Sequence, residues 1–435
     1  MTASPWHRAA PRIAFAALAD RLIATNLVCD PWIDDAERFD PSPLLLGDDD
    51  LDELASIARR IGAAWDEAMQ LVAREPELLD TWYDYTPSQK AMWEMSGGAW
   101  HGFARMDAFP VGDGWQICEL NADTPSGQSD ILACAEVFEA LHPELEDPNR
   151  AHGEQVAALV DRWFRAHTGE DRAPRTLGIV YPTELPEDIL LIRTWELVFE
   201  RAGLTVQRGS PFNLTFDDDG TVRLFGEPMD VILRHYKTDW WGDRLPSRTD
   251  EPPLPDPVPL PQLAPLLEAD RAGRVLVVNP FGSMVAQDKR TMALLWARRD
   301  ALSDEARATV ETLIPETVRV SDIGAARLLA ERADWVLKSD FGCEGEEVVI
   351  GARCTDAEWA AEVAACFAER WIAQRYFEVA ERVPGCDVNL GLYLVGGSFG
   401  GLYVRTTPRG VLTGIRARVV TPMRRREPAA HGDET

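Results

Sequence analysis

The chain has 435 residues, of which 46% are hydrophobic and 27% charged, as is usual for a globular protein large enough for two or three domains. Its formal net charge of −28 argues against nucleic acid or a membrane surface as a partner, because both bind cationic proteins. No apolar run reaches membrane-spanning length and the seven cysteines form no CxxC pair, so we expect a cytoplasmic protein with neither a zinc site nor a disulfide framework.

The chain begins with a helical scaffold, which a β-hairpin follows. Apolar residues recur at helical intervals through much of residues 1–100. The runs 103–109 and 115–121 then alternate in polarity, and the Gly-Asp-Gly sequence centred on Asp113 is typical of a three-residue hairpin loop. Strict alternation places the odd-numbered residues of the second run on one face: Trp115, Ile117, Glu119 and Asn121.

A hard metal ion is the first candidate ligand of this hairpin. With the loop centred on Asp113, Asp107 lies opposite Glu119 and Arg105 lies opposite Asn121. Two carboxylates at a cross-strand distance of roughly 5 Å repel each other unless a cation, either Arg105 or Mg²⁺, lies between them. Because carboxylate and amide oxygens suit Mg²⁺, the hairpin predicts a magnesium site. An exposed hairpin with a solvated salt bridge is the alternative.

A turn and a helix complete residues 101–174, which we group with the hairpin. The hydroxyls of Thr124 and Ser126 lie next to the expected metal site, just before a helix that begins near Asp130. Hydrogen bonds of a turn or a helix cap explain these hydroxyls as well as contact with a substrate does.

Residues 175–245 predict a small α/β domain, because strands and helices alternate along them. The last predicted strand leads into Lys237 and Thr238, at the end of a strand where open α/β sheets bind ligands. A structural role for the tryptophan pair that follows is the alternative. Residues 246–265 are too rich in proline for a helix or a central strand, so we expect a linker or a long surface loop.

The lysines of residues 266–423 predict a nucleotide-binding unit. Only four of the 44 basic residues in the chain are lysines, and the others are arginines. Each lysine is therefore a candidate for a position where a compact ammonium, rather than a guanidinium, is needed. Lys289 lies at the start of a predicted helix, where the positive helix end and the ammonium together favour an anion. Lys338 lies on a predicted strand, and the turn after it contains Gly342 and Gly345, whose backbone amides can close over phosphates.

The remaining elements complete a series of motifs that resembles a known family. A strand carries Gln374, a hairpin ends at Arg405, and residues 424–435 have the composition of a disordered tail. In order, the series resembles the ATP-grasp ligases of the glutathionylspermidine synthase family. The resemblance rests on these blocks: Arg105 and Asp107, the run Glu119 to Pro125, Lys237 to Trp240, Asp288 and Lys289, Lys338 with its glycine turn, and Gly401 to Arg405.

This resemblance implies an α/β protein with a permuted ATP-grasp fold, in which the early hairpin joins the C-terminal strands in one catalytic site. It also implies an N-terminal helical region and a small pre-ATP-grasp-like α/β domain. The implied site residues are the Mg²⁺ ligands Asp107, Glu119 and Asn121, the catalytic residues Arg105 and Arg405, the ATP contacts Lys289, Lys338, Gly342, Gly345 and Gln374, and the substrate contacts Thr124, Ser126 and Thr238.

The activity that the resemblance implies is an ATP- and Mg²⁺-dependent ligation. A peptide-like carboxylate would join an amine through an acyl-phosphate, with release of ADP and phosphate. The acidity of the chain is compatible with a cationic amine such as a polyamine. One alternative is a nucleotide-binding scaffold without activity, because Ser339 and the Cys343-Glu344 pair depart from the family pattern of the glycine turn. Another alternative is a Mg²⁺-dependent phosphohydrolase.

Overall fold

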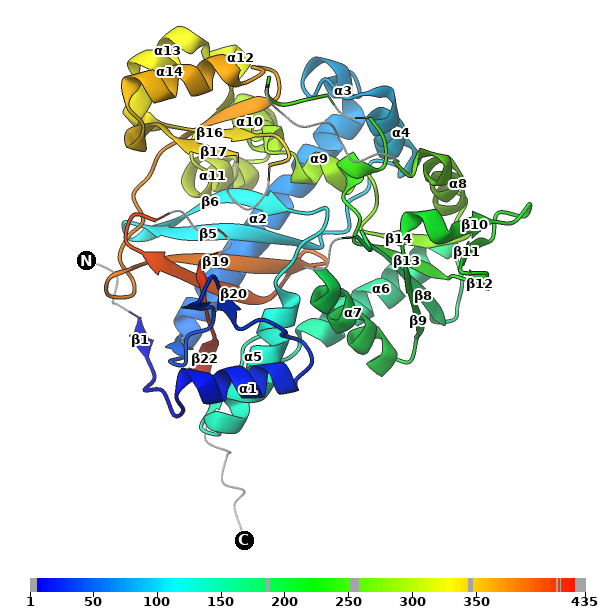
Figure 1. The fold of residues 1–435 in the computed structure, drawn as a ribbon. Helices are drawn as coiled ribbons and strands as arrows, with labels where there is room; N and C mark the ends of the chain where they lie inside the picture. Colours follow the sequence, from blue (N-terminus) through cyan, green and yellow to red (C-terminus); the bar gives the residue numbers. More distant parts are fainter. Residues whose placement is uncertain are drawn as a thin grey trace.

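A five-stranded antiparallel sheet at the centre of the molecule joins strands from distant parts of the chain (Figure 1). In the computed structural model, β5 of the early hairpin pairs with β19 near the C-terminus, as a permuted ATP-grasp fold requires, so this expectation is confirmed. The strands are, in spatial order, β21 (Arg418–Val420), β20 (Ser398–Pro408), β19 (Cys386–Val395), β5 (Ala104–Val111) and β6 (Gly114–Asn121). The structure describes residues 6–184, 188–243, 245–249, 258–342, 347–411, 414 and 416–426.

The β5–β6 hairpin has the predicted register at its polar residues, but it reaches this register through a β-bulge. Arg105 pairs with Asn121 and Asp107 with Glu119, as expected. The loop has two residues rather than three, because Val111 pairs with Gly114. A shift of register after Asp107 leaves Cys118 as the extra residue of a bulge, and this residue restores the predicted pairing.

The bulge also separates residues that strict alternation places on one face. Trp115 and Ile117 are buried in the main apolar core together with Leu120. Glu119 and Asn121 therefore lie on the opposite face of β6, and the prediction that all four odd-numbered residues share a face was wrong. The period of two holds only where no bulge interrupts the strand.

Different helices cover the two faces of the central sheet. α2 (Asp48–Arg74) packs its apolar stripe against even-numbered residues of the strands, such as Leu392. On the other face, α1 (Phe15–Ala24) and α5 (Gln128–Leu141) pack against odd-numbered residues, such as Tyr393. Arg105 and Asp107 lie on this second face of β5, so the candidate site is on the side of α5.

A second antiparallel sheet lies beside β6, in the upper part of Figure 1. Its strands are β15 (Thr317–Arg319), β18 (Trp371–Arg375), β16 (Trp335–Ser339) and β17 (Val348–Ile350), in that spatial order. Three short helices cover one face through a tryptophan-rich core: α12 (Val320–Ile323), α13 (Ala325–Ala330) and α14 (Asp356–Ala365). Nearer the first sheet lie α9 (Ser283–Gln287), α10 (Arg290–Ala297) and α11 (Asp304–Leu313).

The small α/β unit contains a four-stranded parallel sheet, which confirms the predicted pre-ATP-grasp-like unit. In spatial order its strands are β14 (Leu276–Val278), β13 (Val231–Arg234), β8 (Thr176–Val180) and β9 (Thr205–Gly209), with α6 (His152–Thr168) and α7 (Ile189–Arg201) packed on them. Beside this sheet lies a small antiparallel one of β10 (Leu214–Phe216), β11 (Val222–Leu224) and β12 (Glu227–Pro228).

Two boundaries of the predicted units need correction. β14 was expected to open the nucleotide-binding unit at 266–423, but it pairs with β13 and so belongs to the small parallel sheet. The proline-rich segment 246–265 was expected to be a linker or a long surface loop without a helix, but α8 (Leu260–Arg271) begins within it. A proline in the first turn of a helix loses no hydrogen bond, which explains how Pro261 is accommodated.

The segment 1–100 is only partly the helical scaffold that we expected. It contains α1, α2, α3 (Leu78–Thr81) and α4 (Pro87–Met95). It also contains strands that are too short to show an alternation of polar and apolar residues in the sequence. β1 (His7–Arg8) and β4 (Leu44–Leu45) form a sheet with β22 (Pro422–Arg425) and β7 (Leu145–Glu146), while β2 (Trp32–Ile33) pairs with β3 (Ala36–Glu37). The prediction of a tail from residue 424 was wrong at its start, since Arg424 and Arg425 belong to β22, while residues 427–435 lie outside the described residues. Among the helices of the described residues, none combines the length and the apolarity that a bilayer span requires.

Asp147, just after β7, is a buried carboxyl whose charged form is destabilised by its surroundings. It is 1% exposed, and its Oδ2 atom has no hydrogen-bond partner among the described residues. Burial raises the pKa of Asp147 to about 7. A carboxyl whose pKa is higher in the folded than in the unfolded state contributes stability at low pH, and this contribution is lost as the pH rises through the folded pKa.

We therefore expect Asp147→Asn to change the pH dependence of folding stability. Relative to the variant, the wild-type protein should lose on the order of 2 kcal/mol of unfolding free energy between about pH 5.5 and pH 8.5. Urea unfolding of both proteins at the two pH values measures this difference. A difference that does not change with pH would contradict the assignment.

Candidate active site

Asp107 lies between two arginines on the face of the central sheet that α5 covers. Nε of Arg105 donates to Oδ1 of Asp107 at 3.1 Å, and a terminal nitrogen of Arg405 donates to Oδ2 at 2.7 Å. Burial acts to raise the pKa of Asp107, but the charges of the two arginines outweigh it and hold this pKa below its ordinary value. The sequence left open whether Arg105 or Mg²⁺ lies beside this carboxylate, and in the structure Arg105 and Arg405 balance its charge.

Gly391 on β19 gives both arginines access to the same carboxylate. It pairs with Asp107 across the sheet, and a Cβ atom at this position would come within 2.7 Å of Cδ of Arg105. Arg405 lies on β20, opposite Asn389, whose Oδ1 also accepts from the Arg405 guanidinium at 2.6 Å. The missing side chain of Gly391 therefore leaves the space in which the two guanidinium groups and the carboxylate meet.

Lys289 provides the cation beside the second carboxylate of the hairpin. Its Nζ lies 3.2 Å from Oε1 of Glu119 and donates to the backbone oxygen of Gly342 at 2.5 Å. Lys289 is the N-cap residue of α10, and the positive end of this helix together with the ammonium favours an anion beside it. Among the described residues, Glu119 is that anion. Two residues after Glu119, the side-chain nitrogen of Asn121 is buried and has no hydrogen-bond partner among the described residues.

Lys338 on β16 faces the hairpin from the second sheet. Its Nζ donates to Oε1 of Gln374 at 2.8 Å and to the backbone oxygen of Cys118, the bulge residue, at 2.9 Å. Gln374 is fixed in turn by a hydrogen bond of 3.0 Å to the hydroxyl of Thr317 on β15. Lys338 is 6% exposed, and within the described part of the chain its ammonium contacts no carboxylate. A buried cation held only by neutral oxygens is costly, so this ammonium favours an anion beyond those that the described residues supply.

The electrostatics of Cys118 show that four predicted residues converge at the bulge. Burial raises the pKa of its thiol to about 11. The charges of Lys338 and Lys289 act to lower this pKa, and those of Asp107 and Glu119 act to raise it. The two sheets therefore bring residues from β5, β6, β16 and the start of α10 to one place.

The loop after β6 is attached to Arg105. A terminal nitrogen of Arg105 donates to the backbone oxygen of Ser126 at 3.0 Å, and the Tyr393 hydroxyl donates to the same oxygen at 2.8 Å. The side chains of Thr124 and Ser126 remain partly exposed beside this anchor. Their contact with a substrate stays a prediction. Gly345, the second predicted glycine of the phosphate turn, lies outside the described residues.

Sequence reasoning missed a buried network that supports the same loop. Asp123 is 6% exposed and accepts hydrogen bonds from the backbone nitrogen of Thr238 at 2.7 Å, from the Thr238 hydroxyl and from Arg234. Nδ2 of Asn279 donates to the backbone oxygen of Ala122 at 2.8 Å. Thr238, predicted as a substrate contact, is itself 1% exposed and here holds Asp123. Arg234 gave no signal in the sequence beyond its place at the end of an apolar strand.

The polar atoms of the hairpin fit a hard cation. The Glu119 side chain is 21% exposed, and Asp107 keeps lone pairs beyond the two that its arginines use. Among the described residues, no group of three or more His, Cys, Asp or Glu side chains is placed to bind a metal, so an ion here would need the Asn121 amide and oxygens of a ligand. A surface cavity of about 520 Å³ lies elsewhere, between α5, α6 and α7, and none of the predicted site residues lines it.

Comparisons with known proteins point to one family. A family model described as glutathionylspermidine synthase pre-ATP-grasp matches residues 67–422. The structure of a glutathione synthetase-like effector from Globodera pallida in its apo form has 9% sequence identity and a TM-score of 0.57, over 94% of this chain and 95% of that chain, which shows a shared fold. A putative gamma-glutamylcysteine synthetase from Methylobacillus flagellatus has 13% identity and a TM-score of 0.47, over 83% and 87% of the two chains. No curated protein sequence matches significantly.

Proposed function

Because this chain belongs to the glutathionylspermidine synthase family of pre-ATP-grasp proteins, we propose that it is an ATP- and Mg²⁺-dependent ligase that joins a carboxylate to an amine. The observation that carries the proposal is the Lys338 ammonium, which is buried against the neutral oxygens of Gln374 and Cys118. A phosphate would supply the anion that the described residues do not provide there. Lys289, 2% exposed at the start of α10, supplies a second cation for the same phosphates.

The proposed reaction has two steps. In the first, a carboxylate oxygen of the substrate takes the γ-phosphoryl group of ATP, and ADP leaves. In the second, the nitrogen of an amine attacks the acyl carbon, the C–O bond to phosphate breaks, and an amide and inorganic phosphate form. Both steps require placement of groups and balance of negative charge rather than a protein nucleophile.

The residues around Asp107 fit this chemistry. Arg105 lies between the carboxylate of Asp107 and the backbone of Ser126, so it would place positive charge between the metal site and the substrate loop. Arg405 would add a second positive charge on the other side of Asp107. Asp107, Glu119 and Asn121 would hold Mg²⁺, which supplies neutralisation of the phosphate oxygens when it is bound.

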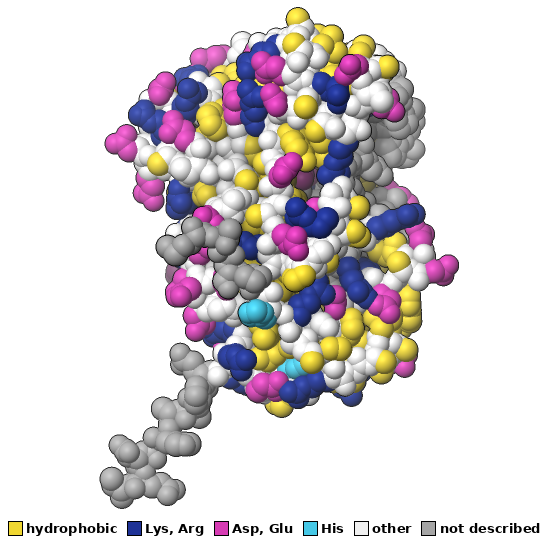
Figure 2. Space-filling view, turned by 90° about the vertical axis from the view of Figure 1, so that its left-hand side faces the viewer, with side chains coloured by type: hydrophobic (Ala, Val, Ile, Leu, Met, Phe, Trp, Pro, Cys, Tyr) yellow, Lys and Arg dark blue, Asp and Glu magenta, His cyan; other side chains and the backbone are white. Residues whose placement is uncertain are grey.

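The substrates are proposed by class. Thr124 and Ser126 are small hydroxyl donors of the kind that bind a peptide carboxylate, and the net charge of −28 favours a cationic amine. The face of the molecule in Figure 2 carries acidic and basic side chains intermixed, unlike the basic stripe of a nucleic-acid-binding protein.

A substrate panel tests the proposed ligase. The protein is incubated with ATP, Mg²⁺, small peptides that have a free carboxylate, and diamines or polyamines, and ADP and product masses are measured. We expect ADP to form only when both an acid and an amine are present, together with a product whose mass is that of the two minus one water. A nucleotide-binding scaffold would give no ADP with any pair, and a phosphohydrolase would release phosphate without an amide product.

A further inference from the structure

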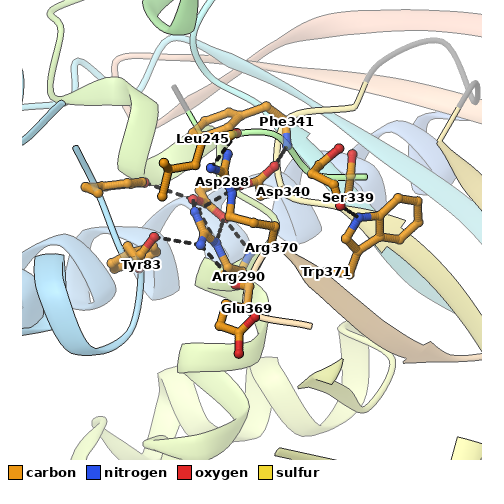
Figure 3. A network of polar contacts seen from close by, with 12 residues as sticks. Tyr83, Leu245, Asp288, Arg290, Ser339, Asp340, Phe341, Glu369, Arg370 and Trp371 are labelled. Carbon is orange, nitrogen blue, oxygen red and sulfur yellow. Dashed lines mark hydrogen bonds and ion pairs between the residues drawn. The ribbon is translucent and has the colours of Figure 1, made fainter. Parts of the chain in front are cut away.

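A buried cluster of two aspartates and two arginines includes both sequence neighbours of Lys289, Asp288 and Arg290 (Figure 3). Asp288, Arg290, Asp340 and Arg370 are each 3% exposed or less. Arg290 donates from Nε and a terminal nitrogen to Asp288, at 2.7 to 3.2 Å, and the same terminal nitrogen lies 3.1 Å from Asp340. Arg370 donates to Asp340 from the other side. The cluster is neutral overall, since each sign of charge occurs twice.

The cluster fixes the backbone around Lys289 and the backbone that follows Lys338. Asp288 and Arg290 flank Lys289, whose backbone nitrogen donates to the backbone oxygen of Asp340 at 3.1 Å. Asp340 comes two residues after Lys338 and two before Gly342, whose carbonyl accepts from Nζ of Lys289. The ion pairs between Arg290 and these two aspartates therefore hold the start of α10 against the end of β16.

The same arginines reach three further segments. Arg290 donates to the backbone oxygens of Tyr83 at 2.6 Å and Glu369 at 3.1 Å, and Arg370 donates to that of Leu245 at 2.8 Å. The Tyr85 hydroxyl completes the environment of Asp288 at 2.9 Å. Five segments, from the N-terminal helices to the second sheet, thus meet at four charged side chains.

Stability alone does not account for such a cluster. Buried ion pairs lose most of their mutual attraction to the cost of desolvation, and apolar residues of the same volume usually stabilise a core as well or better. In this cluster each charge tolerates only an arrangement that satisfies it, which favours a single geometry of the segments that carry the four side chains. This cluster lies where the backbone of Lys289 is hydrogen-bonded to that of Asp340, two residues after Lys338.

We propose that Asp288, Arg290, Asp340 and Arg370 are positioning residues, which set the location of Lys289 relative to the end of the strand that carries Lys338. As far as it concerns ATP, this inference rests on the proposed function. Its structural content does not, because the placement of Lys289 can be measured in the free protein.

Chemical labelling of lysines tests the placement without any nucleotide. The chain has only four lysines, so acetylation of each is resolved by mass spectrometry, and Lys90, with a side chain 31% exposed, serves as the internal reference. In the wild-type protein we expect Lys289 to be labelled far more slowly than Lys90. In the charge-balanced variant Asp288→Asn/Arg290→Gln, well below its melting temperature, we expect labelling of Lys289 to speed up on the order of tenfold.

Two controls separate placement from stability. Glu75→Gln/Arg298→Gln removes a charge-balanced pair with contacts of 2.6 and 2.8 Å at the opposite end of the same helix α10. Val310→Ala creates a space in the apolar core without touching the cluster. Both are expected to leave Lys289 protected even where they lower the melting temperature as much. If the first cluster variant does not fold, Asp340→Asn/Arg370→Gln interrupts the cluster from its other side.

ATP binding by the same proteins gives the second readout. We expect the cluster variants to bind ATP on the order of tenfold more weakly than the wild type, and the controls to bind it normally. Folded cluster variants that keep Lys289 protected and bind ATP normally would overturn the positioning role. A wild-type protein that does not bind ATP would overturn the proposed function instead, while the labelling result would still decide the placement of Lys289.

Discussion

Arg105→Ala is expected to lower turnover by a factor on the order of 10² to 10³ while it changes ATP affinity less than tenfold. A positive charge that acts mainly in the transition state contributes to turnover and little to the affinity of the ground state. Arg105 meets this condition because it joins Asp107 to the loop that carries Ser126, where the acyl-phosphate would form. Its loss does not leave Asp107 unpaired, since Arg405 still donates to the same carboxylate at 2.7 Å.

Single-turnover ADP formation and nucleotide affinity, measured on the same variant, check this expectation. If Arg105 served only as a salt-bridge partner, the variant would lose Mg²⁺ and ATP affinity together and would keep its turnover at saturation. Arg409→Ala is the matched control, because Arg409 pairs with Asp387 on the neighbouring ladder of β19 and β20 and lies outside the site. It should leave both quantities unchanged.

Lys338→Ala should weaken ATP binding by a factor on the order of 10 to 100, because a hydrogen bond to a charged group contributes about 1.5 to 3 kcal/mol to the binding free energy. Lys338→Arg should not restore the affinity. The ammonium fits between two oxygens at 2.8 and 2.9 Å, and a planar guanidinium has neither the size nor the geometry for that position.

Isothermal titration with ATP and Mg²⁺ measures both Lys338 variants. Lys90→Ala is the control, because Lys90 pairs with Asp80 on the surface. Equal losses of ATP affinity in Lys90→Ala and Lys338→Ala would contradict the inference that Lys338 binds the phosphates of ATP. Recovery of affinity in Lys338→Arg would show that charge alone, without the shape of the ammonium, is sufficient.

Local patterns in the sequence predicted the longer strands and most of the helices, because these show a period that neighbouring residues carry, but they missed short strands such as β1 and β4. The same patterns could not predict the bulge at Cys118, since a bulge residue differs from its neighbours in no property that a period detects. The expected pairing of Asp107 with Glu119 came out correctly although the assumed loop was one residue too long. The extra loop residue and the missing bulge cancelled each other.

The pairing of distant strands lay beyond local patterns. β14 follows the proline-rich segment in sequence and was placed with what comes after it, but it pairs in parallel with β13 across that segment. Nothing in residues 275–278 distinguishes the two outcomes, because both demand a short buried apolar strand.

The supporting residues of the candidate site were also hidden in the sequence. Scarcity made the lysines noticeable, whereas Arg290 is one of many arginines and gave no sign that it is fully buried. Asp123 belongs to one of the sequence blocks on which the family resemblance rests, yet its partner Arg234 lies far along the chain. Buried pairs of this kind are visible only when the fold has brought the two positions together.

The order of strands in the central sheet has a consequence for the nascent chain. β5 and β6 leave the ribosome long before β19, the strand that pairs with β5 in the central sheet. Until then Asp107 has Arg105 but not Arg405, and the edge of β5 has no strand to pair with. Contacts over such a separation also close slowly. The candidate site is therefore complete only once β19 and β20 have both been translated, so a polypeptide that stops before β20 carries all of the expected metal ligands but lacks Arg405.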